Sequence, residues 1–291
     1  MKLFVRDLTV IDASYLCLQR GMVGESWLVD IELTGSLNEM SMLLDFARVK
    51  KNLKAIIDAE VDHRLLVPLC TDASQVAVVQ PEYHVVDFAS EKGSIHLHAP
   101  SQAFCFIPAQ AITVESVTAY LYNVIRERLP ENIDGLTLTL RPEAIAGASY
   151  HYSHGLKKHD GNCQRIAHGH RSTIELWVDG ERNNQLEQQW ARRWADIYLG
   201  SIDDLVELNA LELSARAHDV LTDQHYGFCY QAPQGRFQLA IPKACCELID
   251  TDTTVELLAD YILRQLQCSM PDRALRVVAY EGVGKGAIAE S

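Results

Sequence analysis

The sequence lacks any long apolar run, and no stretch approaches the roughly 18 residues that a membrane-spanning helix needs. Its first ten residues, MKLFVRDLTV, carry Arg6 and Asp7 where a secretory signal would be apolar, so we expect no signal peptide. Basic residues are scarce, with 26 Lys and Arg against 39 Asp and Glu and a net charge of −13. This deficit argues against nucleic acid or an anionic membrane as the main partner.

Cysteine is present, but not in the spacing of a zinc ribbon or a redox motif. None of the eight cysteines belongs to a CxxC pair, and no export signal accompanies them. We therefore expect reduced thiols in a cytoplasmic protein. With 291 residues, 48% of them hydrophobic and 22% charged, the chain has a globular composition and room for two domains.

The chain repeats itself, since four segments recur in the same order roughly 140 to 145 residues later. The matching pairs are MVGESWLVDIELTG (22–35) with the segment that holds Gly169 and ends at Gly180, VDHRLL (61–66) with IDDLVE (202–207), ITVESVTAYLYNVI (112–125) with TTVELLADYILRQL (253–266), and LTLRPEAIAG (138–147) with VVAYEGVGKG (277–286). The sequence therefore predicts a tandem duplication, with one domain at 1–146 and the other at 147–291.

Each half is expected to contain the same elements: two strands, a helix, an insertion, a second helix and a last strand. Alternating apolar residues around the repeated glycine predict strands, and apolar residues at helical spacing predict helices over 45–60 and 187–199. The second helix of each half is expected to open at Thr113 or Thr254. This order favours an α+β fold in which helices cover one face of an antiparallel sheet.

His168 and His170 flank a single glycine at the start of a predicted strand. Side chains at i and i+2 of a strand point the same way, so the two imidazoles share one face. They make part of a zinc site, because catalytic zinc usually takes three protein ligands. The preceding segment offers His151, His154 and His159 as the third ligand. The alternative is a casual pair of solvated histidines.

Two further features offer proton chemistry. Cys163 lies in a loop shortly before His168, and a thiol near a cation ionises close to neutral pH. Asp62 precedes His63, and a carboxylate beside a histidine can hold it for proton transfer. Each feature alone is weak, because most lone cysteines are inert and a surface Asp-His pair is the commoner explanation.

Glu143 and Glu281 each follow a predicted strand at matching positions of the two halves. A carboxylate at a strand end can accept two hydrogen bonds from a guanidine-like edge, such as the amino-pyrimidinone of a pterin or guanine. The alternative is an exposed acid with no ligand.

Together these motifs resemble the 6-pyruvoyltetrahydropterin synthase family, which includes the 6-carboxytetrahydropterin synthases of queuosine biosynthesis. The family pattern is F-x-A-x-H, a loop cysteine, HGH on a strand, D-F before a helix, L-D-H, T-x-E-N and a closing glutamate. The N-terminal half shows IDASY, LLDFARVK, VDHRLL, TVES and LRPEAIAG, and the C-terminal half shows YHYSH, the cysteine, HGH, TVEL and VAYEG. The resemblance covers nearly the whole chain, apart from an insertion in each half.

This resemblance implies two tandem T-fold domains, each an antiparallel sheet with two helices on one face, that assemble into a barrel-like homo-oligomer. It also implies a zinc-dependent lyase that eliminates triphosphate from 7,8-dihydroneopterin triphosphate and makes a 6-pyruvoyl- or 6-carboxy-tetrahydropterin. The implied partner is a small pterin rather than nucleic acid or a membrane.

Family roles transfer by position onto residues of this chain. They are Zn²⁺ ligation by His154, His168 and His170, proton acceptance by Cys163, a proton relay through Asp62 and His63 that the family supplies from a neighbouring subunit, and pterin anchoring by Glu281 or Glu143. His154 is preferred to His151 as third ligand because YHYSHGL aligns with F-x-A-x-H-x-L.

The two halves depart from the family pattern in different places. At the three ligand positions the N-terminal half reads Tyr15, Val23 and Glu25, and it lacks the loop cysteine, so it should not bind zinc. In the C-terminal half the aligned relay position reads Asp203-Asp204. We therefore expect one composite site, with the relay supplied by the N-terminal half. The alternatives are a catalytically inactive tandem T-fold that binds a pterin or purine, and another T-fold chemistry such as cyclohydrolysis.

Overall fold

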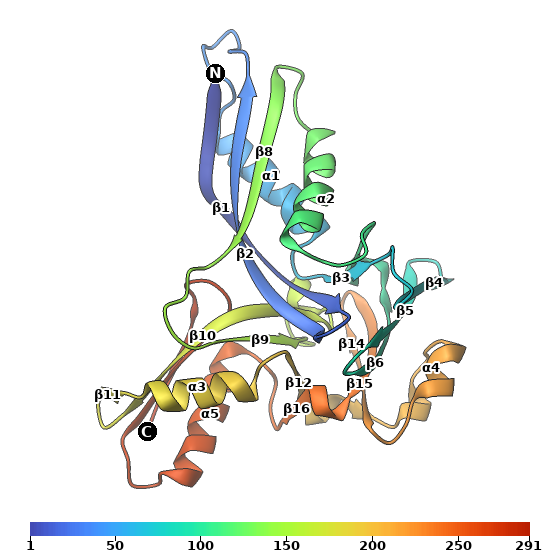
Figure 1. Ribbon diagram of the computed structural model, residues 1–291, viewed down its shortest axis with the longest axis vertical. Coiled ribbons are helices and arrows are strands. Elements are labelled where there is room, and N and C mark those ends of the chain that lie inside the picture. Colours follow the sequence, from blue (N-terminus) through green and yellow to red (C-terminus); the bar gives the residue numbers. More distant parts are fainter.

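The computed structural model describes the backbone of residues 1–291 and every side chain except those of Phe46 and Arg48. The chain forms two similar halves and, beside them, a third sheet built from both insertions (Figure 1). Strand β8 ends the first half at Pro142, and β9 begins the second at Ser149.

The N-terminal half is a five-stranded sheet with two helices on one face (Figure 1). In order of pairing, its strands are β7 (Phe104–Ile107), β3 (Leu65–Pro68), β1 (Lys2–Cys17), β2 (Gly21–Gly35) and β8 (Ile133–Pro142). The helices are α1 (Phe46–Glu60) and α2 (Val114–Arg126). Leu53 and Ile57 of α1 and Leu121 of α2 are buried in one core with Ile31 of β2.

The C-terminal half repeats this arrangement. In order of pairing, its strands are β16 (Cys246–Ile249), β12 (Ile197–Ser201), β9 (Ser149–His154), β10 (His168–Val178), β17 (Leu275–Tyr280) and β18 (Gly286–Glu290), with β11 (Glu181–Arg182) paired to the end of β10. The helices are α3 (Asn184–Arg193) and α5 (Val255–Ser269). Trp194, Ile262 and Leu176 share the core of this half.

The expected α+β fold is confirmed, and the long hairpins of both sheets are antiparallel. The short strands β3, β7, β12 and β16 pair in parallel, so each sheet is mixed on one side of the hairpin. The expected caps are also confirmed: the side chains of Thr113 and Thr254 accept hydrogen bonds from backbone N–H groups in the first turns of α2 and α5. Among the described helices, none is both long and apolar enough to cross a bilayer.

The prediction that a helix runs over 187–199 is wrong at its C-terminal end. Helix α3 ends at Arg193, and Asp196 adopts a left-handed backbone with φ 56°. Ile197 and Tyr198, which were expected on the helix, instead pair with strand β9. Over so short a run, their apolar side chains fit the period of a helix as well as that of a strand. Pairing with the sheet makes this segment a strand.

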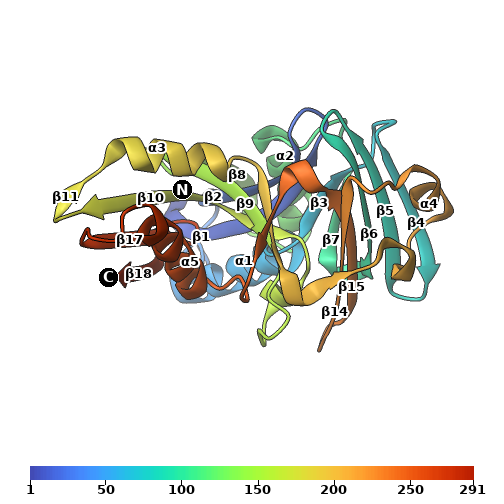
Figure 2. The ribbon, with the colours of Figure 1, turned by 90° about the horizontal axis from the view of Figure 1, so that it is seen from below.

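The insertions of the two halves combine into one six-stranded sheet (Figure 2). In order of pairing, its strands are β13 (Leu205–Val206), β14 (His225–Ala232), β15 (Gly235–Pro242), β6 (Gly93–Pro100), β5 (Tyr83–Ser90) and β4 (Ser74–Gln80). The short helix α4 (Ala215–Val220) lies beside them. Strand β15 of the second half pairs directly with β6 of the first, opposing Leu239 to Leu97.

The β1–β2 and β9–β10 hairpins meet at their repeated glycines. A Cβ atom added to Gly24 would lie 1.9 Å from the Tyr152 carbonyl oxygen, and one added to Gly169 would lie 2.7 Å from Gly24 Cα. At the same place Ser14 Oγ and Ser153 Oγ, which are equivalent in the two halves, lie 2.7 Å apart. Both halves need glycine here because two backbones pass too closely for any side chain.

Candidate metal centre and active site

Three histidines of the C-terminal half meet on one face of the β9–β10 hairpin. His154 lies directly across from His168 in the antiparallel register, and His170 follows two residues later on the same face. All three side chains are buried, with at most 1% exposure. Each offers a ligand atom, and these atoms lie within 4.8 Å of one another, which suits a metal ion.

The surroundings of these rings fit a metal. The ring Nδ1 of His154 lies 3.0 Å from the Thr253 carbonyl oxygen, and that of His168 lies 3.1 Å from the Arg165 carbonyl oxygen. The Nε2 atoms of His154, His168 and His170 are buried without a hydrogen-bond partner among the described residues. Burial lowers the pKa of His154 and of His168 well below the ordinary value, so both rings are neutral. Neutral imidazoles with one nitrogen anchored are what metal ligation requires.

The other two histidines of the segment lie outside this cluster. His151 Nδ1 contacts the Gly24 carbonyl oxygen at 2.7 Å, and His159 Nδ1 accepts a hydrogen bond from Gly161 N at 2.9 Å. The β9–β10 register explains the choice, because residue 154 opposes residue 168 and residue 151 does not. The alternative of a solvated His168–His170 pair is wrong, since both rings are buried.

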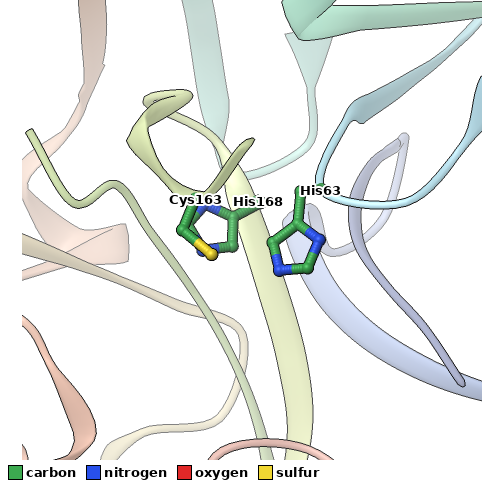
Figure 3. A group of neighbouring side chains, drawn as sticks. All are labelled: His63, Cys163 and His168. Atoms are coloured by element: carbon green, nitrogen blue, oxygen red, sulfur yellow. The ribbon is translucent and has the colours of Figure 1, made fainter. Parts of the chain in front are cut away.

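The histidine of the Asp62–His63 pair in the N-terminal half lies beside Cys163 and His168 of the C-terminal half (Figure 3). His63 and His168 have ring centroids 5.1 Å apart, and the ligand atoms of His63, Cys163 and His168 lie within 4.8 Å of one another. Within the Asp-His pair, Asp62 Oδ2 lies 2.7 Å from His63 Nδ1. Asp62, His63 and Cys163 therefore form a continuous path from a carboxylate to a thiol, and this path runs beside the three-histidine cluster.

His63 is a strong base in this setting. Burial disfavours its charged form, but the hydrogen bonds with Asp62 and Cys163 outweigh burial and raise the pKa of His63 to about 10. The ring is therefore an imidazolium at neutral pH, which places a cation beside the Cys163 side chain. His63 also has a left-handed backbone with φ 53°, an uncommon conformation for a non-glycine residue.

The loop that carries Cys163 is tied to the relay by Arg165, a residue that our sequence analysis missed. Arg165 is 4% exposed, and its Nη1 donates to the backbone carbonyls of Asp62 and His63 at 3.4 and 3.3 Å. Tyr230, from the insertion, donates to the Gln164 carbonyl at 2.8 Å. Nothing in the sequence indicates these contacts, because each joins segments far apart in the chain.

Asp12 and Lys285 are two more residues that the sequence did not single out. Asp12 Oδ1 lies 3.2 Å from His170 Nδ1, at ion-pair distance but without the alignment of a good hydrogen bond. Lys285 Nζ lies 3.3 Å from Asp12 Oδ2 and 3.8 Å from Glu281 Oε2. Burial alone would raise the pKa of Asp12, but His170, Lys285 and Ser26 outweigh it and hold that pKa below its ordinary value.

The two strand-end glutamates differ in their surroundings. Glu281 Oε1 lies 3.9 Å from His170 Nε2, so this carboxylate is at the three-histidine cluster. Glu143 contributes its backbone carbonyl to Arg171 Nη1 at 2.7 Å, and within the described chain no ion pair joins its carboxylate to the cluster. Of the two predicted anchors, the structure thus brings Glu281 to the three-histidine cluster.

The equivalent place in the N-terminal half has no cluster of metal ligands among the described residues. Tyr15, Val23 and Glu25 occupy the three positions, and Glu25 Oε2 lies 3.8 Å from His151 Nδ1. Burial raises the pKa of Glu25 to about 7. In this half β1 and β2 are joined by the short turn 18–20, whereas the longer loop 155–167 joins β9 and β10. The N-terminal half therefore has no counterpart of the loop that carries Cys163.

The counterpart of His63 is Asp196, and the alignment with Asp203-Asp204 is wrong. Strand β3 pairs Leu65 with Ser14, and β12 pairs Tyr198 with Ser153, so the residue two places earlier is His63 in one half and Asp196 in the other. Asp204 instead pairs with Lys157 at 2.5 Å. The mismatch arises because α3 has 10 residues where α1 has 15, which shifts the spacing.

Asp196 forms an ion pair with Arg20, whereas Asp62 holds a histidine. Its carboxylate accepts hydrogen bonds from Arg20 Nε at 3.0 Å and Arg20 Nη2 at 2.5 Å. Arg20 also donates to Tyr15 Oη at 3.1 Å. The second site of the duplication is therefore closed by an ion pair across the two halves.

The chain is similar to one family of known proteins. The family model described as 6-pyruvoyl tetrahydropterin synthase matches the chain twice, over residues 19–146 and 144–291. Among solved structures, the chain is similar to a catalytic residue mutant of Plasmodium vivax 6-pyruvoyltetrahydropterin synthase, with 17% identity, a TM-score of 0.40, and coverage of 48% of this chain and 90% of that one. It is also similar to the Plasmodium falciparum 6-pyruvoyl tetrahydropterin synthase, with 14% identity, a TM-score of 0.37, and coverage of 48% and 97%. No curated protein matches the chain.

Proposed function

The chain belongs to the 6-pyruvoyl tetrahydropterin synthase family as a tandem member, and we propose that it is a zinc-dependent lyase acting on 7,8-dihydroneopterin triphosphate. The product is of the 6-pyruvoyl- or 6-carboxy-tetrahydropterin type. One composite site per chain carries the reaction, with groups drawn from both halves.

One observation carries this proposal. His63 of the N-terminal half lies within reach of Cys163 and His168 of the C-terminal half, although each half alone has lost part of the family motif (Figure 3). Proton transfer requires such contact, because a relay works only at hydrogen-bond distance or through one water.

The donor set supports zinc. His154, His168 and His170 would hold the ion, since their three buried Nε2 atoms have no other partner in the described chain. When bound, the ion supplies a Lewis acid that polarises the oxygens of the substrate side chain.

The remaining roles belong to the chain itself. Glu281 accepts hydrogen bonds from the amino-pyrimidinone edge of the pterin and so fixes its orientation beside His170. The Cys163 thiolate takes a proton from the substrate side chain. His63, held by Asp62, stabilises that thiolate and returns a proton later in the reaction.

The test is incubation of the zinc-replete protein with 7,8-dihydroneopterin triphosphate, followed by mass spectrometry of the products. We expect release of triphosphate and a pterin with a shortened or oxidised side chain. Cys163→Ala and His63→Ala serve as inactive controls, because both keep the three histidines. Binding of the pterin without triphosphate release would favour the alternative, a catalytically inactive pterin-binding protein.

We also propose that the chain forms a homo-oligomer in which the T-fold sheets complete a barrel. Strand β8 ends the N-terminal sheet, and its outer edge pairs with no strand of the described chain. An exposed strand edge is a natural place for another copy to pair.

A further inference from the structure

A carboxylate of the N-terminal half reaches into the metal centre of the C-terminal half. Asp12, on strand β1, is 3% exposed, and its Oδ1 lies 3.2 Å from Nδ1 of His170. The other ring nitrogen of His170, Nε2, faces the side of Glu281 and has no hydrogen-bond partner among the described residues. The imidazole therefore has one nitrogen turned to a carboxylate and the other left open.

The three histidines differ in this respect. His154 and His168 each turn Nδ1 to a neutral backbone carbonyl, of Thr253 and of Arg165. Only His170 has a carboxylate at Nδ1, and that carboxylate comes from the other half of the chain. A negative charge at Nδ1 favours the tautomer with the proton there, which leaves the Nε2 lone pair for a metal and makes it more basic.

Asp12 is itself held in place. Ser26 Oγ donates to Asp12 Oδ1 at 2.5 Å, and Lys285 Nζ lies 3.3 Å from Oδ2. A Cβ atom on Gly282 would lie 2.6 Å from Asp12 Oδ1, so only glycine, here with φ 70°, leaves room for the carboxylate. A buried carboxylate is costly unless it is paired, and every partner here fixes its direction.

The backbone of Asp12 also holds the relay. Its N–H donates to Asp62 Oδ1 at 2.8 Å, and its carbonyl accepts from His63 N at 2.7 Å. One residue of strand β1 thus fixes both the turn that presents His63 and the ring of His170.

We propose that Asp12 is the positioning residue of the metal centre, which sets the tautomer and orientation of His170 from the opposite half of the duplication. This inference rests on the proposed three-histidine site. It adds the Asp12 carboxylate to the two relay residues, Asp62 and His63, that the N-terminal half supplies to the site. At the equivalent place in the closed second site the chemistry is exchanged: His151 takes the position of Asp12, and Glu25 takes that of His170. An acid–imidazole contact is kept at both crossings, but only the one at Asp12 leaves a free imidazole nitrogen beside two more histidines.

The test compares metal binding by Asp12→Ala and Asp12→Asn with that of the wild-type chain, by competition with a chromophoric zinc chelator. Loss of such a partner typically weakens metal affinity by about 10- to 100-fold, and we expect this for Asp12→Ala, with a smaller loss for Asp12→Asn. The Co²⁺-loaded variants should show a changed visible spectrum, and nitrogen NMR of the apo variants should show a changed His170 tautomer. Asp30→Asn is the matched control, since it removes another buried, ion-paired carboxylate of the same hairpin.

Zinc affinity within twofold of wild type in both folded Asp12 variants, with an unchanged Co²⁺ spectrum, would overturn the inference. If Asp12→Ala does not fold, Ser26→Ala keeps the charge but releases the carboxylate. We then expect roughly threefold weaker zinc binding, and equal affinity would overturn the inference. His168→Ala separates the two levels: if it also binds zinc like wild type, the three-histidine site itself is wrong, whereas loss of zinc there with normal Asp12 variants defeats only the role of Asp12.

Discussion

Asp196 occupies in the C-terminal half the place that His63 occupies in the N-terminal half. Both residues have a left-handed backbone, with φ 56° and 53°. Each lies two residues before the one that pairs in parallel with a hairpin serine, Tyr198 with Ser153 and Leu65 with Ser14. His63 meets the thiol of Cys163, whereas Asp196 binds the guanidinium of Arg20. The same turn therefore presents the histidine of the proposed relay at one crossing and an ion-paired carboxylate at the other.

We expect one zinc ion per chain, because only one half keeps a cluster of three histidines. His168→Ala and His170→Ala should lose the metal while keeping most of the secondary structure. Elemental analysis of purified protein measures the stoichiometry, and circular dichroism checks the fold. Two tightly bound equivalents, or none after expression with ample zinc, would contradict the assignment.

His63→Ala and Cys163→Ala should each lower kcat by at least about 10²-fold, since each removes a proton-transfer group. The two groups meet within one chain, so refolding the two inactive proteins together should restore no activity. Recovery of activity in the mixture would mean that the working contact forms between chains. Wild-type turnover by His63→Ala would defeat the relay.

Glu281→Gln and Glu143→Gln should have unequal effects, because only Glu281 lies beside His170. We expect kcat/KM to fall by about 10²-fold for the first, which loses an oriented charged acceptor, and by less than about threefold for the second. Steady-state kinetics with the same substrate measure both. Equal losses would show that both glutamates hold the pterin.

Arg165→Met should uncouple the cysteine loop from the relay, because the guanidinium joins that loop to the carbonyls of Asp62 and His63. We expect kcat to fall about tenfold while zinc content stays at the wild-type level. Arg193→Met is the control, since it removes an arginine that pairs with Glu247 on the far side of the same half. A loss of zinc would instead assign Arg165 to the metal site.

The pH dependence of stability should carry a signature of Glu25. Burial raises its pKa to about 7 in the folded chain from 4.5, so the folded state binds the extra proton between these values. Stability therefore falls as pH rises from about 4.5 to 7, by up to about 3 kcal/mol. Glu25→Gln should remove this loss of stability. The free energy of unfolding of the variant should therefore exceed that of wild type by an amount that grows between pH 5 and 7.5.

Chemical denaturation at several pH values measures that difference. Glu32→Gln, on the same strand but partly exposed, is the control for a Glu-to-Gln change outside the buried site. Parallel profiles for wild type and Glu25→Gln would show that Glu25 is ionised throughout.

Local patterns in the sequence were sufficient for the fold and for part of the site. Alternation revealed the hairpins, threonine caps marked two helices, and the glycine between His168 and His170 placed two imidazoles on one face. These features depend on residues close together in the chain, whose geometry follows from the periods of helix and strand.

The missed features depend on contacts between distant segments. Asp12 meets His170, and Arg165 meets the turn at His63, only because the two hairpins cross, and no spacing in the sequence encodes that crossing. The misplaced counterpart of His63 has a different cause. A shorter helix shifted the spacing of the copies, and a chance match to Asp203-Asp204 filled the gap.

The pairing of β6 with β15 has an evolutionary consequence. Duplication normally leaves a spare copy, which can be deleted or split off as a separate gene. Here strands of both copies belong to one sheet. Separation of the copies would leave the edges of β6 and β15 unpaired, where Leu97 now faces Leu239. The composite site that we propose would make each copy depend on the other a second time. Loss of either half would therefore leave the other half with an unpaired strand at this sheet.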